Sequence, residues 1–298
     1  MNAPRRPSSF PEQPGTIERI ERGDGRYPND LEDLRENAPS RLTARGQLDL
    51  LRVTPRVAIV GTRRATPYGQ RVTRELADAF ARAGACVISG LALGIDGTAH
   101  RAALDTGGAT IAVLGTGLDF AFPRSHRELQ ARIARDGVLL SELEPHEHGQ
   151  PWTFLKRNRI IAGLAAVTIV VEAGAKSGAL NTAGHALHLG RTVAAIPGPI
   201  DQPQCAGTNA LLRDGAQVIA SIEDALALAG LTRPPRAPRC DAASDEGLVW
   251  TALAAGALDI DTLCHQSGLP AARCMAAVTT LEISGSIECG INGEIRRR

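Results

Sequence analysis

The chain has 298 residues, 43% of them hydrophobic, enough to bury the core of one large domain or of one large and one small domain. Its 33 basic and 32 acidic residues leave a formal net charge of +1, which excludes a grossly basic nucleic-acid coat and an acidic solvating chain. Aromatic residues make up only 3%, so no ligand site can be a broad aromatic platform.

The first 55 residues show no regular alternation of strands and helices. Residues 1–15 hold four prolines without periodicity and are expected to form a disordered tail. Residues 16–55 mix short helical patterns with proline and charge, and Leu31 and Leu34 share one helical face after a turn. We therefore predict an N-terminal helical extension over residues 16–55.

A different pattern occupies residues 56–230, where short apolar runs alternate with helical segments. Such alternation is typical of a parallel sheet covered by helices on both faces, and right-handed crossovers then make the fold doubly wound α/β. The predicted strands are 57–60, 86–89, 110–114, 138–140, 167–171, 192–196 and 217–220. The predicted helices are 67–83, 97–106, 124–135, 155–165 and 178–189.

The remainder of the chain reads as a linker and a second, small domain. Residues 231–243 hold three prolines and three arginines, which favours a linker. Residues 244–298 contain three helical patterns and two short strands around the hairpin signal Asn292-Gly293. Three helices and a terminal hairpin predict a winged-helix domain.

The six cysteines are scattered, and no pair has Cys-x-x-Cys spacing. No apolar run is long enough to span a bilayer, and the N-terminus lacks the apolar stretch of a secretory signal. We therefore expect a reduced, cytoplasmic protein. The cysteines are Cys86, Cys205, Cys240, Cys264, Cys274 and Cys289.

Ligands of an open parallel sheet bind at the carboxyl ends of its strands, so the loops there are the candidate site. After the first predicted strand, Gly61 allows a tight turn, and Arg63 and Arg64 precede a helix. Free amides at that helix N-terminus, beside two arginines, predict a phosphate cradle. The alternative is an exposed turn with solvated arginines.

The loop after the second predicted strand is rich in glycine, which lets the backbone approach a ligand closely. In this loop Asp96 can cap the next helix, and His100 follows one helical turn later. The two could form a metal or acid–base dyad. A capping aspartate with a packed histidine is the simpler interpretation, and we favour it.

Two further segments carry the only lysines of the chain. Lys176-Ser177-Gly178 opens a helix, which suits a phosphate group, but its spacing does not match a P-loop, so triphosphate binding is rejected. Lys156-Arg157-Asn158-Arg159 lies in another helical segment, where a solvated basic helix end is the alternative. His146 and His148, near three glutamates, could bind a metal, but a mobile polar loop is the better interpretation.

Taken together, these segments resemble the DprA (Smf) family of bacterial DNA-processing proteins. The resemblance covers roughly residues 20–298, and the specificity lies in the full series of motifs rather than in any one of them. The motifs are Val57–Arg63, Ser89–His100, Arg157–Gly163, Ser177–Ala183, Pro197-Gly198 and Gly207–Asn209.

The resemblance implies an extended Rossmann-like fold that binds single-stranded DNA, forms a homodimer and loads RecA recombinase in natural transformation and recombination. It implies no enzymatic activity, no cofactor and no metal. The DNA contacts that it implies, together with their basic neighbours in the same loops, are Arg63, Arg64, Phe154, Lys156, Arg157, Asn158, Arg159 and Lys176. The residues expected to shape the pocket are Gly61, Ser89, Gly90, Gly94, Asp96, Ser177 and Gly178.

Two alternatives concern function. Nucleoside monophosphate phosphoribohydrolases have a similar Rossmann-like fold, but their Pro-Gly-Gly motif is missing here. Winged helices often read duplex DNA, yet residues 245–295 hold seven acidic residues against one base, Arg273. Phosphate neutralisation dominates DNA affinity, so we expect the winged helix to be a protein-contact or regulatory element instead.

Overall fold

The structure, a computed structural model, describes residues 15–232, 241–290 and 293–297. The chain divides into two compact units, residues 1–232 and residues 233–298. All of the expected disordered tail except Gly15, and most of the expected linker, lie outside the described residues. Within the described ranges, no helix has both the length and the apolar character needed to cross a bilayer.

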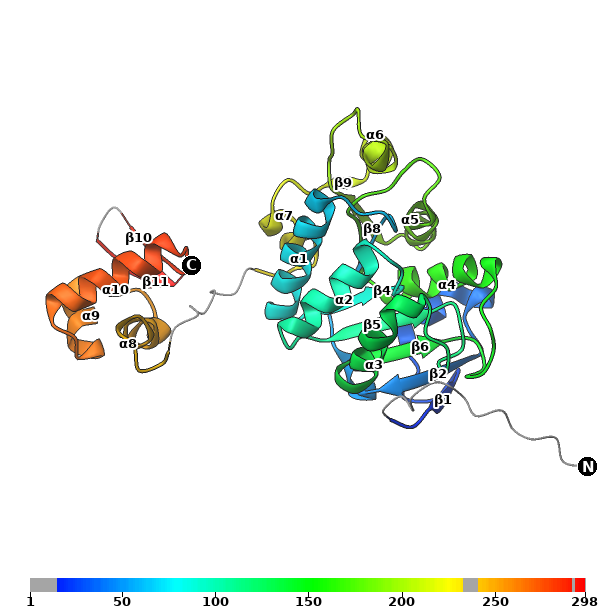
Figure 1. The fold of residues 1–298 in the computed structure, drawn as a ribbon, viewed down its shortest axis with the longest axis horizontal. Coiled ribbons are helices and arrows are strands. Elements are labelled where there is room, and N and C mark those ends of the chain that lie inside the picture. Colours follow the sequence, from blue (N-terminus) through cyan, green and yellow to red (C-terminus); the bar gives the residue numbers. More distant parts are fainter. Residues whose placement is uncertain (1–14, 233–240, 291–292, 298) are drawn as a thin grey trace, which may run out of the picture. The chain divides into compact units, whose positions relative to one another are not determined.

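The larger unit is built on a nine-stranded sheet with the order β1-β2-β6-β5-β4-β3-β7-β8-β9 (Figure 1). The seven strands from β6 to β9 in this order run parallel, which confirms the predicted doubly wound α/β fold. The strands are β1 (Glu18–Glu21), β2 (Arg41–Gly46), β3 (Arg56–Val60), β4 (Cys86–Ser89), β5 (Thr110–Leu114), β6 (Val138–Ser141), β7 (Val167–Val170), β8 (Thr192–Ala195) and β9 (Gln217–Val218).

The strand order also fixes where a ligand can bind. From β3 the chain builds outward through β4, β5 and β6, and then returns to the other side of β3 as β7, β8 and β9. The loops after β3 and β7 therefore diverge to opposite faces of the sheet and leave a crevice between them, the usual ligand position of such folds.

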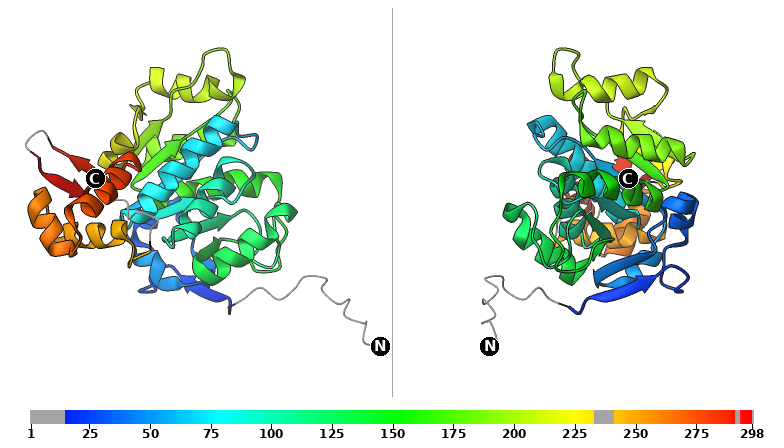
Figure 2. Two further views of the ribbon diagram at one scale, coloured as in Figure 1. Left: turned by 60° about the vertical axis from the view of Figure 1, so that its left-hand side comes forward. Right: turned by 90° about the vertical axis from the view of Figure 1, so that its right-hand side faces the viewer.

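Helices cover both faces of the sheet (Figures 1 and 2). The first face carries α1 (Pro67–Arg82), α2 (Ile95–Asp105), α3 (Arg127–Asp136) and α7 (Ile222–Leu228). The second face carries α4 (Pro151–Leu164), α5 (Gly178–His188) and the 3-10 helix η1 (Asn29–Asn37). The helices α7 and α6 (Ala206–Arg213) were not predicted from the sequence. The remaining 3-10 turns are η2 (Leu48–Arg52), η3 (Arg124–His126) and η4 (Pro203–Cys205).

The prediction of a helical extension over residues 16–55 was wrong in part, because the segment holds two strands as well as two 3-10 helices. This segment supplies β1 and β2, which add to the sheet antiparallel, so the sheet is mixed at this edge. In β2 the apolar residues Leu42 and Ala44 are two apart, which is the period of a strand rather than of a helix. Leu31 and Leu34 do share a face, but in η1, where both are buried against Gly163 of α4.

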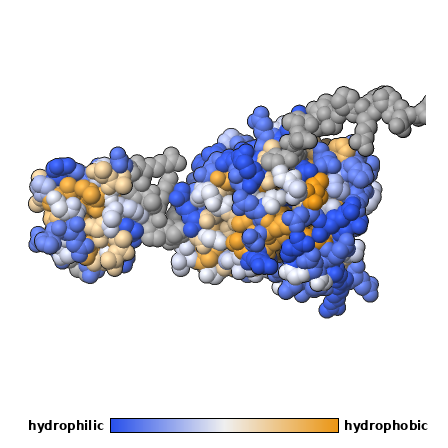
Figure 3. Space-filling model, turned by 90° about the horizontal axis from the view of Figure 1, so that it is seen from below, coloured by the Kyte–Doolittle hydropathy of each residue, from blue (hydrophilic) through white to orange (hydrophobic). Residues whose placement is uncertain are grey.

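Charged side chains protect the sheet edge formed by β1. Arg22 pairs with Glu32, and Arg26 pairs with both Glu18 and Asp24. Viewed from below this edge, the larger unit is mostly hydrophilic with apolar patches in between (Figure 3). Charges along an edge strand discourage further strand pairing.

The smaller unit has the predicted three helices and two strands around a core of its own. This core includes Val249, Leu263, Val278 and Leu281. Its elements are α8 (Asp245–Ala252), η5 (Leu253–Ala255), α9 (Ile260–Ser267), α10 (Ala271–Ile283), β10 (Ile287–Cys289) and β11 (Ile295–Arg297). β10 and β11 pair antiparallel, whereas Asn292 of the predicted hairpin turn lies outside the described residues.

Candidate nucleic-acid interface

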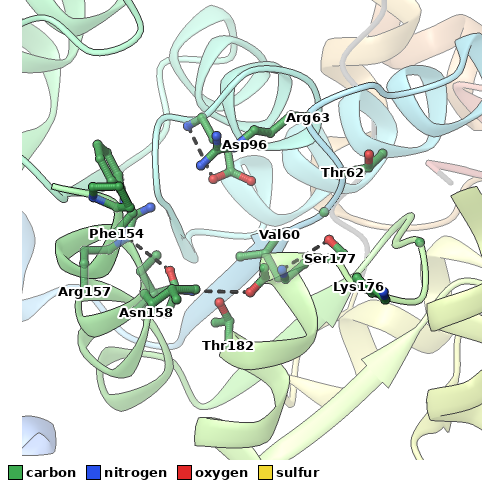
Figure 4. Close-up of a pocket in the computed structure, with 18 of the residues that line it drawn as sticks. Val60, Thr62, Arg63, Asp96, Phe154, Arg157, Asn158, Lys176, Ser177 and Thr182 are labelled. Atoms are coloured by element: carbon green, nitrogen blue, oxygen red, sulfur yellow. Dashed lines mark hydrogen bonds between the residues drawn. The ribbon is translucent and has the colours of Figure 1, made fainter. Parts of the chain in front are cut away.

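A cleft of about 830 Å³ lies at the crevice between β3 and β7. The loop after β3, the first turns of α4 and the loop that opens α5 form its walls, and their side chains gather around one open space (Figure 4). The predicted site residues that line it are Gly61, Arg63, Arg64, Asp96, Phe154, Arg157, Asn158, Lys176, Ser177 and Gly178. Ten of the fifteen residues predicted for the site therefore line one cleft.

The exposed positive charge of the cleft comes from Arg63, Arg64 and Lys176. Arg63 and Arg64 lie on the loop after β3, and Lys176 lies on the loop before α5; Figure 4 labels Arg63 and Lys176. In the described part of the chain, no carboxylate forms an ion pair with any of the three. Their charges therefore remain available for an anion that enters the cleft.

Contrary to the prediction, the phosphate cradle expected at the start of α1 is already filled. The buried carboxylate of Glu172, at the end of β7, accepts a hydrogen bond of 2.9 Å from the Thr66 amide and another from the Thr66 hydroxyl. Gly69 leaves the space for it, since a Cβ there would come within 2.4 Å of the carboxylate. An internal anion thus neutralises this helix N-terminus, and sequence separation hid the pairing.

The N-terminus of α5 faces the cleft. Ser177 caps it by accepting a hydrogen bond of 3.3 Å from the Ala179 amide. Ser177, Gly178 and Ala179 all line the cleft beside Lys176. The partial positive charge of a helix N-terminus therefore adds to that of the lysine.

Arg157 lies beneath the cleft and is buried rather than free. Its guanidinium donates to the carbonyl oxygens of Gly90, at 2.7 Å, and of Val113, and to the Asn158 side chain at 3.2 Å. Buried Asp96 accepts from the Gly90 amide at 3.1 Å and attracts the same guanidinium. Burial raises the pKa of Asp96 and lowers that of Arg157 to about 10, while the opposite charges counteract both shifts.

Lys156 and Arg159, expected as DNA contacts, do not line the cleft. Both pair with Glu142, at 3.2 Å and 2.7 Å, on another side of α4. Helical spacing explains the separation, because the cleft-lining residues Phe154, Arg157, Asn158 and Ile161 follow the i, i+3, i+4, i+7 pattern of one face.

Phe154 has an aromatic partner, Phe122, which was not predicted as a site residue. The ring of Phe122 lies 4.8 Å from that of Phe154, centroid to centroid, and is 48% exposed. Both rings line the cleft. The exposed ring offers an apolar surface beside the three cations.

The other residues predicted to shape the pocket, Ser89, Gly90 and Gly94, do not line the cleft but pack against the loops that form it. Ser89 is buried and donates to the Ile59 carbonyl at 2.6 Å. Gly94 has a φ of +75°, and a Cβ there would lie 2.3 Å from the Thr62 carbonyl oxygen. Gly90 lines a smaller cavity under the Phe122–Phe154 pair. These positions hold the loop that carries Arg63.

The histidines considered as metal ligands have other contacts. His100 is buried, its Nδ1 lies 2.8 Å from the Thr110 hydroxyl, and burial lowers its pKa to about 3. It is therefore a neutral packed histidine, as expected. The expected helix cap was wrong, because Asp96 lies in the first turn of α2, whose N-cap is Gly94, and its carboxylate instead accepts from the amides of Gly90 and Ala92 in the preceding loop. His148 packs on the Phe120 ring at 3.9 Å between centroids.

Two family models match the chain. The family model of DNA recombination-mediator protein A matches residues 18–230, and the model of the DprA winged helix domain matches residues 233–290. This chain belongs to the DprA family. The resemblance found in the sequence is thereby confirmed, as is the winged-helix domain.

Individual relatives of this DprA family member agree. DNA processing protein DprA of Streptococcus pneumoniae is 43% identical over 67% of this chain and 70% of its own length. A crystal structure of S. pneumoniae DprA matches with a TM-score of 0.67 at 40% identity over 74% of each chain. A structure of Helicobacter pylori DprA, described for its single-stranded DNA binding mode, matches with a TM-score of 0.65 at 34% identity, over 70% of this chain and 94% of that one.

Proposed function

We propose that the cleft binds single-stranded DNA by its phosphates, without reading sequence and without a chemical step. The observation that carries this is the group of three cations, Arg63, Arg64 and Lys176, which lie at the switch point of the sheet and form no ion pair with any residue that the structure describes. Cations contact the backbone, and an exposed ring accepts any base, because every base has a π-face. The binding mode described for the H. pylori relative supports the same ligand.

Single strands suit this site better than duplex DNA. In a duplex the bases are stacked and paired, so Phe122 and Phe154 could contact a base only after strand opening. We expect fluorescence anisotropy to give tighter binding to oligothymidylate than to a duplex of equal length at every salt concentration. Equal affinities, or a preference for duplex, would contradict the proposal.

We include RecA loading and homodimer formation in the proposed function on family membership alone. The family name, recombination-mediator protein, supports a role in passing single strands to a recombinase.

For the winged helix we propose a protein-contact or regulatory role rather than DNA binding. The arginines in its described part are already engaged. Arg273 pairs with Asp245 at 2.8 Å, Arg296 pairs with Glu288, and Arg297 lies over the Trp250 ring at 4.2 Å. The other charges are mostly acidic, so a phosphate backbone would be repelled.

Because the winged helix is not expected to contact DNA, truncation after residue 232 should leave the affinity for single-stranded DNA within about twofold of the full chain. Such a change corresponds to less than about 0.5 kcal/mol of binding free energy. Anisotropy titration measures the affinity, and circular dichroism checks that the remaining unit is folded. A folded truncation that no longer binds would place the winged helix in the DNA site.

A further inference from the structure

A second cavity of about 750 Å³ lies next to the cleft and has no part in the function proposed so far. It is lined by the start of α1, by the end of β7 and by the loop between β8 and η4. This loop carries Pro197-Gly198, one of the motifs of the sequence, which does not line the cleft. The residues that line the cavity include Tyr68, Glu172, Pro197, Pro199, Gln202 and Cys205.

Hydrogen bonds hold both walls of this cavity in place. The Asn209 side chain accepts from the Gly198 amide at 3.2 Å and donates to the Gly198 carbonyl at 2.9 Å. Gly198 is packed so tightly on Cys205 that a Cβ would lie 2.2 Å from the sulfur. On the opposite wall, the Glu172 carboxylate fixes Thr66. A ligand would therefore meet a cavity that is already formed, which lowers the entropic cost of binding.

The chemistry of the walls suits a flat, uncharged, partly polar ring. Tyr68 is 38% exposed, and the Arg71 guanidinium lies over its ring at 5.5 Å from the centroid. The prolines add apolar surface, and the Gln202 amide can donate and accept hydrogen bonds. Burial raises the pKa of Cys205, so its thiol stays protonated and acts as part of the wall. A phosphate would not be favoured beside Glu172.

The two cavities lie on either side of one short segment, residues 61–66. Thr62, Arg63 and Arg64 line the cleft, and Thr66 lines the second cavity. A strand held in the cleft can cross this segment with a phosphate near Arg64, which forms no ion pair among the described residues, and place a base beyond the cleft beside Tyr68. The occupant is thus identified by its continuity with the cleft and by the arginine at the crossing.

We propose that this cavity is a second nucleobase subsite, in which an unstacked base of the same DNA strand lies against Tyr68. The inference rests on the function proposed for the cleft. It predicts that the bound strand extends beyond the cleft, past Arg64, toward the loop between β8 and η4.

The test uses the full chain and a ladder of oligothymidylates that grows by one nucleotide at a time. Wild type should gain affinity in two steps, first when the strand fills the cleft and again when it reaches the second cavity. Tyr68→Ala should remove only the second step and weaken binding of the longer strands roughly 5- to 100-fold, the usual effect of losing one base–aromatic stack. Tyr68→Phe keeps the ring and should behave as wild type.

A second readout does not depend on affinity. Oligonucleotides with one 5-iodouracil at successive positions should crosslink to Tyr68 a few nucleotides away from the position that crosslinks to the Phe122–Phe154 pair. If Tyr68→Ala matches wild type across the ladder and no position crosslinks to Tyr68, the subsite does not exist, and a peptide is the better candidate occupant. That failure is distinct from failure of the cleft, in which Arg63→Ala and Lys176→Ala would leave binding of even the shortest strands unchanged.

Discussion

Replacing Arg157 by alanine is expected to lower the free energy of unfolding by about 3–5 kcal/mol, the cost of leaving a buried charge without its compensating cation and buried acceptors without their donor. The guanidinium satisfies the carbonyl oxygens of Gly90 and Val113 and counters the charge of buried Asp96. Without it, a carboxylate and two carbonyls remain in an apolar interior. Urea denaturation followed by circular dichroism measures the change.

Lys156 provides the matched control for this variant. It is the preceding residue on the same helix, but half of its side chain is exposed, and its pair with Glu142 is a surface pair. Lys156→Ala should cost less than about 1 kcal/mol. If the two variants lose similar stability, Arg157 does not hold the floor of the cleft. If Arg157→Ala instead loses DNA affinity at unchanged stability, Arg157 contacts DNA directly.

The double variant Arg63→Ala/Lys176→Ala is expected to bind single-stranded DNA about 10- to 100-fold more weakly than wild type. Each side chain supplies one charge-assisted contact, and a loss of about 1.4 kcal/mol corresponds to a tenfold change in affinity. Because phosphates carry no sequence, the loss should be the same for oligothymidylate and for mixed sequences.

Arg135→Ala/Arg213→Ala removes the same number of charges outside the cleft. Both arginines are exposed and pair with their neighbours, Asp136 and Asp214. This control should bind within about twofold of wild type, since distant surface charges are screened by salt. An equal loss in both double variants would mean that net charge, rather than the cleft, attracts the DNA.

The sequence predicted the sheet well because its central strands are buried on both faces. Short runs such as Val57–Val60 are continuously apolar, which is typical of strands in a parallel sheet that is covered on both faces. The strands at the β1–β2 edge were missed for the opposite reason. In β2 the four consecutive residues Leu42 to Arg45 are buried, but the strand is only six residues long and contains two arginines, so it is too short and too charged to distinguish from a helix turn.

The sequence predicted which loops line the cleft, but not which side chains within them contact one another. That Arg63 and Lys176 meet follows from the rule for parallel sheets, because both follow central strands. That Glu172 fills the start of α1 depends on a contact between residues 106 positions apart, which no local pattern encodes. That Lys156 and Arg159 lie away from the cleft could also have been predicted, since helical periodicity alone separates them from the face that carries Phe154.

The salt dependence of binding tests the central claim most directly, because it counts the phosphates that the protein neutralises. On single strands, each contact contributes roughly 0.7 to the slope of log affinity against log salt. For Arg63→Ala/Lys176→Ala we predict a slope about 1.4 smaller in magnitude than for wild type, with the Arg135→Ala/Arg213→Ala slope unchanged. A slope equal to that of wild type in the cleft variant would show that Arg63 and Lys176 do not contact DNA phosphates and would contradict this assignment of the cleft.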